Sequence, residues 1–198
     1  MASPATPHRS TTISERAFTL IELIVVMALM VLLTSIILAN NNQFGGALTL
    51  RILAYQVALS VREAQTYGIS VKKFGDNSFQ SGFGVHFDRS SPSSYVLFGD
   101  GLSKNGLYDQ GELVEAITLS RNFAISDLCA ASGSAASETC GLNTVDILFR
   151  RPEPDAQILI NSEGIAFERA RVILSSPRGD RLSVVVEAAG QIAVSPAP

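Results

Sequence analysis

The residue with the clearest potential for chemistry is Glu22, a single acid inside the apolar stretch RAFTLIELIVVMALM at residues 16–30. An unpaired carboxylate is costly in lipid, so acids inside membrane-length segments are rare and usually functional. No further charged residue follows until Arg51. The pattern predicts that Glu22 pairs with a positive charge from another copy or a neighbouring subunit. The alternative is a carboxylate at the headgroup interface of a simple signal-anchor helix.

A second group of oxygen-bearing side chains lies in the segment GDGLSKNGLYDQGE at residues 99–112. Its candidate Ca²⁺ ligands are Asp100, Asn105, Asp109 and Glu112. The second half of the segment matches an EF-hand-like loop, with Gly106 at the sharp turn, whereas Leu102 and Lys104 stand where further ligands are expected. The segment predicts either a Ca²⁺ site or an ordinary Asn-Gly turn with solvated acids, and the incomplete ligand set favours the turn. No other cofactor is indicated.

The two cysteines, Cys129 and Cys140, flank a short polar segment. In an exported chain they are expected to form a disulfide, which would contribute on the order of 3 kcal/mol for so short a loop. Two free thiols are the alternative. A catalytic thiol is not indicated, because no histidine lies near either cysteine in the sequence to act as a base.

Arginines recur in the last third of the chain, at positions 150, 151, 169, 171, 178 and 181. They could form a DNA-binding patch, for which Arg178 and Arg181 are the candidate residues. Five acids are interleaved with them and the net charge of the chain is −3. A basic site needs a local excess of positive charge, so a mixed solvated surface is the favoured interpretation and DNA binding the less favoured one.

Nothing in the sequence indicates an enzyme. There is no nucleophile elbow, no phosphate-binding loop and no Cys/His spacing typical of zinc. A membrane-tethered exoenzyme would need a convergent acid-base or nucleophile group, and the sequence shows none.

The N-terminal segment must position Glu22. Residues 1–17 form a polar, mildly basic leader, and residues 18–39 are apolar apart from Glu22 and three hydroxyl side chains. As a helix, 22 residues rise about 33 Å, which is close to one hydrocarbon core. The small residue Ala17 precedes the apolar run, so cleavage there would remove the leader and keep a single-pass anchor. Two arginines in the leader favour a cytoplasmic N-terminus.

The segment AFTLIE at residues 17–22, followed by LIVVMALMVLL, resembles the N-terminus of the type IV pilin-like family. That family includes pilins and the pseudopilins of type II secretion, and it usually has Gly where Ala17 stands here. The resemblance implies cleavage between Ala17 and Phe18 by a prepilin peptidase, and methylation of the new amino group of Phe18. It also implies that Glu22 pairs with the terminal amine of an adjacent subunit, which would fix the register between subunits.

The partners and the location also follow from this resemblance. It implies other pseudopilins or pilins and an inner-membrane assembly platform as partners. The protein would lie in the inner membrane, with the rest of the chain in the periplasm or outside the cell, before assembly into a filament.

The next segment reads as a continuation of the helix over residues 40–68. Its first part, NNNQFGG at residues 40–46, is poor in helix formers and predicts a bend or local melting. Helical periodicity then resumes up to Gly68, with one stripe of Leu48, Ile52, Tyr55 and Leu59 and a second of Leu53, Val57, Val61 and Ala64 beside it. The first stripe is predicted to lie on the globular body.

The remaining residues, 69–198, show strand-like runs separated by turns. These runs are 82–88, 94–100, 112–119, 144–150, 156–162, 170–176, 181–188 and 190–195. SSPRGD at residues 175–180 predicts a hairpin. The expected fold is α+β, with a long N-terminal helix whose first half spans the membrane, packed on a C-terminal antiparallel β-rich domain.

Two C-terminal segments carry a second, narrower resemblance. DILFRRPEPDAQI at residues 146–158 and GQIAV at residues 190–194 resemble the minor-pilin group that contains pseudopilin H of type II secretion and the pilus subunit FimT. Together the resemblances imply a minor pseudopilin or minor pilin with a structural role in secretion or pilus biogenesis. The alternative is a minor type IV pilin that binds DNA for uptake.

Overall fold

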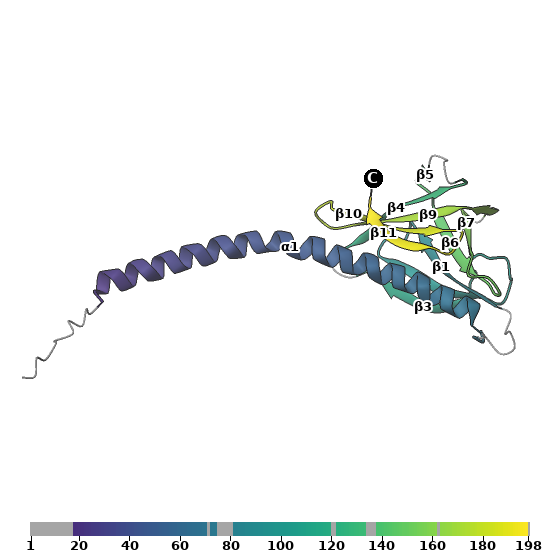
Figure 1. The fold of residues 1–198 in the computed structure, drawn as a ribbon, viewed down its shortest axis with the longest axis horizontal. Helices are drawn as coiled ribbons and strands as arrows, with labels where there is room; N and C mark the ends of the chain where they lie inside the picture. Colours follow the sequence, from purple (N-terminus) through teal and green to yellow (C-terminus); the bar gives the residue numbers. More distant parts are fainter. Residues whose placement is uncertain are drawn as a thin grey trace, which may run out of the picture. The chain divides into compact units, whose positions relative to one another are not determined.

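The structure, a computed structural model, describes residues 18–70, 72–74, 81–119, 122–133, 138–161 and 163–197. The chain divides into two compact units, Met1–Asn42 and Gln43–Pro198 (Figure 1). Helix α1 (Leu20–Ile69) contributes residues to both units. Residues 40–46 are helical, so the local melting predicted for them is not found. Asparagine and glycine cost at most about 1 kcal/mol each in a helix interior, which long flanking helical segments can offset.

The second unit contains two antiparallel sheets. The first has the order β3-β2-β1-β6-β7-β8 and the second the order β11-β10-β9-β4-β5. The strands of the first sheet are β1 (Gly82–Asp88), β2 (Ser94–Asp100), β3 (Leu113–Thr118), β6 (Thr144–Phe149), β7 (Ala156–Ile160) and β8 (Glu163–Phe167). Those of the second are β4 (Ala124–Ala131), β5 (Thr139–Cys140), β9 (Arg169–Ser175), β10 (Arg181–Glu187) and β11 (Ile192–Pro196). The α+β fold with antiparallel sheets is therefore confirmed.

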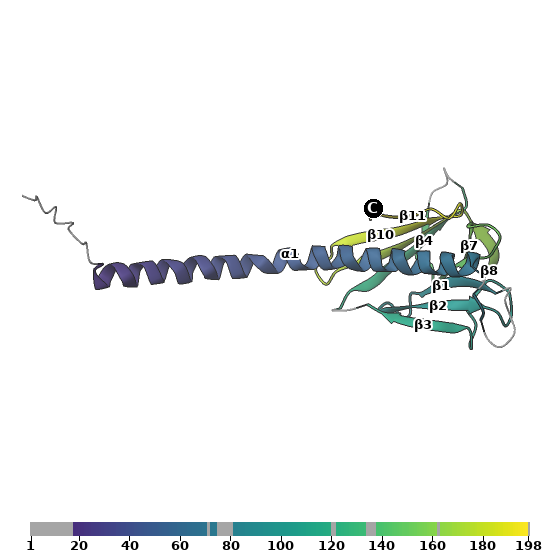
Figure 2. The same cartoon turned by 60° about the horizontal axis from the view of Figure 1, so that its bottom comes forward.

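The hydrophobic core of this unit is shared by the helix and both sheets. Its buried side chains include Val57 of α1, Val85 of β1, Ile147 of β6, Val172 of β9 and Val184 of β10. Figure 2 shows this part of α1 lying between the strands β1 to β3 and the strands β10 and β11. Strand side chains alternate between two faces, and each sheet gives one apolar face to the core.

The structure corrects the prediction about which helical stripe faces the body. The buried face of α1 carries Leu50, Leu53, Ala54, Val57, Ala58, Val61 and Ala64. The first stripe of the sequence analysis, Leu48, Ile52, Tyr55 and Leu59, is instead between 57% and 65% exposed. Small side chains explain why this face is the buried one, because its three alanines let the helix axis approach the strands closely. Gly68 extends this close approach, since a Cβ there would lie 2.4 Å from the carbonyl oxygen of Phe149.

Tyr95 on β2 joins the sheet to the helix. Its ionisation is expected to lower the stability of the fold as pH rises in the alkaline range. Its buried hydroxyl lies 3.0 Å from the Ser60 hydroxyl of α1. Burial raises the pKa of Tyr95 above its ordinary value, with a smaller opposing effect from the Ser60 hydrogen bond. A raised folded-state pKa stabilises the fold fully below the unfolded-state pKa of about 10, and this stabilisation is lost as pH rises through the folded-state pKa.

The measurement is urea unfolding of the detergent-solubilised chain between about pH 8 and pH 11.5. We expect Tyr95→Phe to lower stability at pH 8 by about 1 kcal/mol, because the hydroxyl bond is lost. Above pH 10 the variant should lose stability less steeply than the native chain, by up to about 1.4 kcal/mol per pH unit. Equal slopes in the two proteins would show that Tyr95 ionises as freely in the folded state as in the unfolded one.

Candidate functional site

The first part of the candidate site is the N-terminal end of α1, around Phe18 and Glu22. Ala17, the other residue of the predicted cleavage site, lies outside the described residues. The Phe18 side chain is 78% exposed. The backbone N–H of Glu22 donates to the carbonyl oxygen of Thr19 (3.1 Å) and lies 3.3 Å from the Thr19 hydroxyl. Thr19 therefore caps the helix.

The spacing of Thr19 and Glu22 is a local structural signal that the sequence analysis missed. A threonine followed three residues later by a glutamate is the spacing of a capping box. Glu22 also lies in the first helical turn, where the helix dipole favours a negative charge. The carboxylate is exposed in the single chain, so it remains available to a positively charged partner.

The second part of the site is the apolar surface that follows Glu22. The segment Leu20–Leu38 is long and apolar enough to cross a membrane, and none of it is buried within the described structure. Its two polar side chains beyond Glu22 are satisfied inside the helix: the Thr34 hydroxyl donates to the Met30 carbonyl (2.6 Å) and the Ser35 hydroxyl to the Val31 carbonyl (2.8 Å). Such internal bonds let hydroxyl residues sit in hydrocarbon without unsatisfied donors.

Comparison with known protein families identifies this N-terminal segment. Residues 13–38 match the family described as the prokaryotic N-terminal methylation motif. The chain carries a prokaryotic N-terminal methylation motif. The match spans Phe18, Glu22 and the whole apolar segment, and it is consistent with the type IV pilin-like family.

The methylation motif supports a pilin-like or pseudopilin protein in general. It implies processing by a prepilin peptidase and assembly with other pilins. Together with the apolar helix it suggests a single-pass membrane anchor. Comparisons with curated proteins and with solved structures gave no match.

The second unit has an apolar surface of its own, the exposed stripe formed by Leu48, Ile52, Tyr55 and Leu59. Beside it lies a pocket of about 270 Å³ between α1 and β11, lined by Leu59, Arg62 and Ile192 among others. The Arg62 guanidinium donates to the Ile192 carbonyl across this pocket (3.3 Å). Because large apolar side chains on a helix are normally covered, the exposed stripe indicates an interaction surface.

The four candidate Ca²⁺ ligands hold the loop between β2 and β3 by hydrogen bonds. Glu112 is fully buried, and its Oε1 accepts the backbone N–H groups of Leu102 (2.9 Å) and Ser103 (3.3 Å). Its Oε2 accepts the N–H of Asp109 (3.2 Å). The Oδ2 atom of Asp109 accepts from the Ser103 hydroxyl (2.6 Å) and the Asn105 amide (2.9 Å).

Asp100 anchors the same loop to the sheet. Its Oδ2 accepts the N–H of Gly106 (3.1 Å) and pairs with Arg150, while its Oδ1 is buried without a partner among the described residues. The acids Asp100, Asp109 and Glu112 do not form a group with metal-ligand spacing. Ca²⁺ binding therefore stays a prediction, and the observed role of these side chains is to fix the loop.

Asp146 is a buried acid that sequence analysis did not single out. Its Oδ1 lies 2.7 Å from Nδ1 of His86 and accepts the backbone N–H of Tyr108 (3.2 Å). The Tyr108 ring lies 5.1 Å from the His86 ring. The pair therefore ties β1 and β6 to the loop that follows β2. Only the pairing of β1 with β6 reveals the contact between His86 and Asp146, because 60 residues separate them in the sequence.

Three of the six arginines of the last third have carboxylate partners. Arg169 and Arg171 have carboxylate partners at 2.7 Å, Glu187 and Glu138 respectively. The hydrogen bond to Glu187 raises the pKa of Arg169. Arg150 pairs with Asp100.

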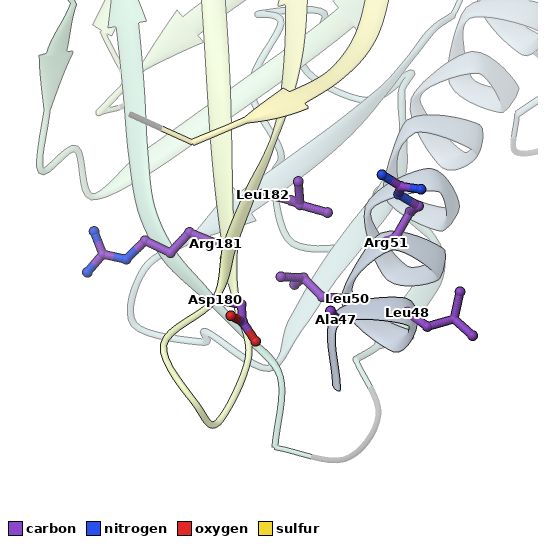
Figure 3. Close-up of a pocket in the computed structure, with 7 residues that line it drawn as sticks. All are labelled: Ala47, Leu48, Leu50, Arg51, Asp180, Arg181 and Leu182. Atoms are coloured by element: carbon purple, nitrogen blue, oxygen red, sulfur yellow. The ribbon is translucent and has the colours of Figure 1, made fainter. Parts of the chain in front are cut away.

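Arg178 and Arg181 are exposed and have no carboxylate partner among the described residues. Arg181 and Arg51 of α1 are among the residues that line a pocket of about 390 Å³ (Figure 3). Arg178 lies near Gly46 of the same helix. Sequence analysis could not have grouped Arg51 with them, because it lies on the helix more than a hundred residues earlier.

Cys129 and Cys140 form a disulfide, as the sequence analysis expected. The two residues face each other across the β4–β5 pair. Asp127 lies close to both sulfur atoms, and its Oδ1 accepts the N–H groups of Leu128 (2.9 Å) and Gly141 (3.0 Å). The disulfide therefore ties the short edge strand β5 to β4 and so to the rest of the second unit.

Proposed function

We propose that this protein is a minor pseudopilin-like or minor pilin subunit, which assembles into a type II secretion pseudopilus or a type IV pilus after prepilin peptidase processing. The observation that carries the proposal is the coincidence of the methylation motif with an apolar helical segment, Leu20–Leu38, that is not buried within the described structure. Such a helix needs lipid or a bundle of similar helices around it. A filament core supplies the second environment.

In this account, Glu22 determines how subunits join. Cleavage after Ala17 would free an amino group on Phe18, four residues before the carboxylate. Each charge alone is expensive in an apolar environment, and pairing between adjacent subunits lowers that cost. Each mature chain would carry a positive amine on Phe18 and a negative carboxylate on Glu22. The amine of one subunit can therefore pair with the carboxylate of its neighbour.

The exposed stripe supports the same proposal from the second unit. It lies outside the predicted membrane span, where water would otherwise contact Leu48, Ile52, Tyr55 and Leu59. Neighbouring subunits in a filament would cover it. The remaining β-rich surface would then face outward, toward other subunits or cargo.

The experiment that tests this function is incorporation into filaments. An epitope-tagged full chain is expressed with sister pilins and an active prepilin peptidase, and sheared filaments are pelleted away from membranes. We expect the tagged chain in the filament pellet as a minor component. Its confinement to the membrane fraction, in cells whose other subunits do assemble, would contradict the proposal.

A second candidate function is DNA capture, favoured by the absence of carboxylate partners for Arg178 and Arg181 among the described residues. Protein–DNA contacts of this kind weaken steeply with salt. We would measure binding of a fluorescent duplex by the detergent-solubilised chain. Salt-dependent binding that is lost in Arg178→Ala/Arg181→Ala would support DNA capture, and binding unaffected by the two substitutions would exclude these residues as its site.

A further inference from the structure

Three basic side chains that have no acidic partner in the part of the chain that the structure describes lie near the first helical residues of the second unit. Arg51 and Arg181 line the pocket of about 390 Å³. Arg178 reaches the same region, because its Cδ atom lies 3.9 Å from the position that a Cβ on Gly46 would occupy. We call Arg51, Arg178 and Arg181 the arginine patch. All three side chains are exposed.

Apolar and charged residues both line this pocket. Figure 3 shows Leu50 and Leu182 between the helix and the strand, Arg51 on the helix, and the Arg181 side chain pointing away from the two leucines. One acid, Asp180, also lines the pocket, and its Oδ2 lies 3.2 Å from the Ser176 hydroxyl. The patch therefore keeps a net excess of two positive charges. Anionic groups spread over one surface match these separated arginine side chains.

The position of the patch along the chain indicates where such a group would come from. Gly46 follows Leu38, the last residue of the candidate span, by eight residues. Eight helical residues rise about 12 Å, and even a fully extended chain of that length spans no more than about 29 Å. The headgroup layer extends several ångströms beyond the hydrocarbon, and the electrostatic potential of charged headgroups reaches about one Debye length, several ångströms, farther. Anionic lipid phosphates are thus the nearest abundant partner.

We propose that the arginine patch binds the phosphates of anionic lipid headgroups beside the chain's own membrane anchor. The inference rests on the proposed membrane-anchored subunit. Binding would hold the second unit against the bilayer before assembly, and extraction into a filament would release it. A DNA duplex is a poorer match, because three arginines with Asp180 among them give few contacts along a run of phosphates.

The test uses the full chain in nanodiscs of two compositions, pure phosphatidylcholine and a mixture with about 30% phosphatidylglycerol. Phenylglyoxal modifies accessible arginines, and mass spectrometry gives the rate at each site. One basic residue near an anionic surface contributes roughly fivefold in binding. We expect the three patch arginines to react about fivefold more slowly in the anionic discs, and high salt to remove the difference. Arg89, which is exposed outside the patch, serves as the internal control.

The substitution Arg51→Gln/Arg181→Gln adds a matched variant. It should remove most of the protection of Arg178 in anionic discs, whereas Arg89→Gln should leave that protection unchanged. Equal rates in both lipids would overturn the inference. Protection by an added DNA duplex without protection by anionic lipid would overturn it in favour of DNA. Failure of the chain to stay in the discs would instead refute the anchor, and with it the proposed function.

Discussion

Glu22→Val should lower the amount of the chain in sheared filaments at least tenfold while leaving its membrane level unchanged. The substitution removes the one acid of the apolar helix, so the Phe18 amine of a neighbouring subunit would be left without a partner. Leaving one member of a buried ion pair uncompensated costs about 3–5 kcal/mol, far more than the 1.4 kcal/mol that corresponds to a tenfold change. Membrane insertion needs only the apolar length, which Val preserves.

Two further variants separate the charge of Glu22 from its position in the helix cap. Glu22→Gln keeps the size and the hydrogen-bonding capacity that a capping box uses, but it carries no charge. The amount of this variant in sheared filaments should fall almost as much as that of Glu22→Val. Thr19→Ala removes the observed cap and keeps the carboxylate, and it should cost about 1 kcal/mol of helix stability and little incorporation. Full incorporation of the Gln variant would show that Glu22 acts through the cap.

Ile52→Glu should also reduce incorporation strongly, about tenfold, by placing a charge in the exposed stripe. Ile52 is 57% exposed in the single chain, so the substitution should leave the fold of the second unit intact. Inside a subunit interface, however, the carboxylate would be desolvated without a partner. The filament pellet assay measures the loss, and thermal unfolding checks that the variant is folded.

The matched control for this prediction is Gln157→Glu. Gln157 is exposed on β7, away from the helix that carries the exposed stripe. The same charge there should leave incorporation near the native level. Equal incorporation of the Ile52 and Gln157 variants would show that the stripe contacts no other subunit.

Local sequence signals anticipated most of the secondary structure. The runs at 82–88 and 94–100 are the strands β1 and β2 with the expected bounds, and SSPRGD joins β9 to β10 as a hairpin. Strands β4, β5 and β8 were not predicted. The β4 segment AISDLCAA lacks alternation, and its pairing with β9 shifts register between Ile125 and Asp127, so neighbouring strands rather than local pattern define it.

The helical stripe shows a different limit of sequence reasoning. Both faces of α1 between residues 48 and 64 carry large apolar side chains, so periodicity alone could not decide which face is buried. Alanines mark the buried face in the sequence, because small side chains permit close packing. Packing density favours the face that approaches the strands most closely, even though the other face has the larger side chains.

The candidate site was also only partly readable from the sequence. Phe18 and Glu22 are parts of one local motif, so their spacing in the sequence was enough to predict them, and the family match spans both residues. Asp100, Asp109 and Glu112 have the side chains of Ca²⁺ ligands, but the same oxygens can accept hydrogen bonds from the protein, as they do here: Asp100 and Glu112 from backbone N–H groups, and Asp109 from the Asn105 side-chain amide. Arg51 joins Arg181 only through tertiary packing. Such groupings depend on the fold and leave no trace in local spacing.

The most direct test of the whole account is the mass of the mature N-terminus. The full chain is produced in cells with an active prepilin peptidase, purified from the membrane fraction, and its N-terminal peptide analysed by mass spectrometry. We predict a chain that begins at Phe18 with a methylated amino group, the group that Glu22 of a neighbour would meet. A chain that retains residues 1–17 in those cells would contradict the account, because no free amine would then exist beside the apolar helix.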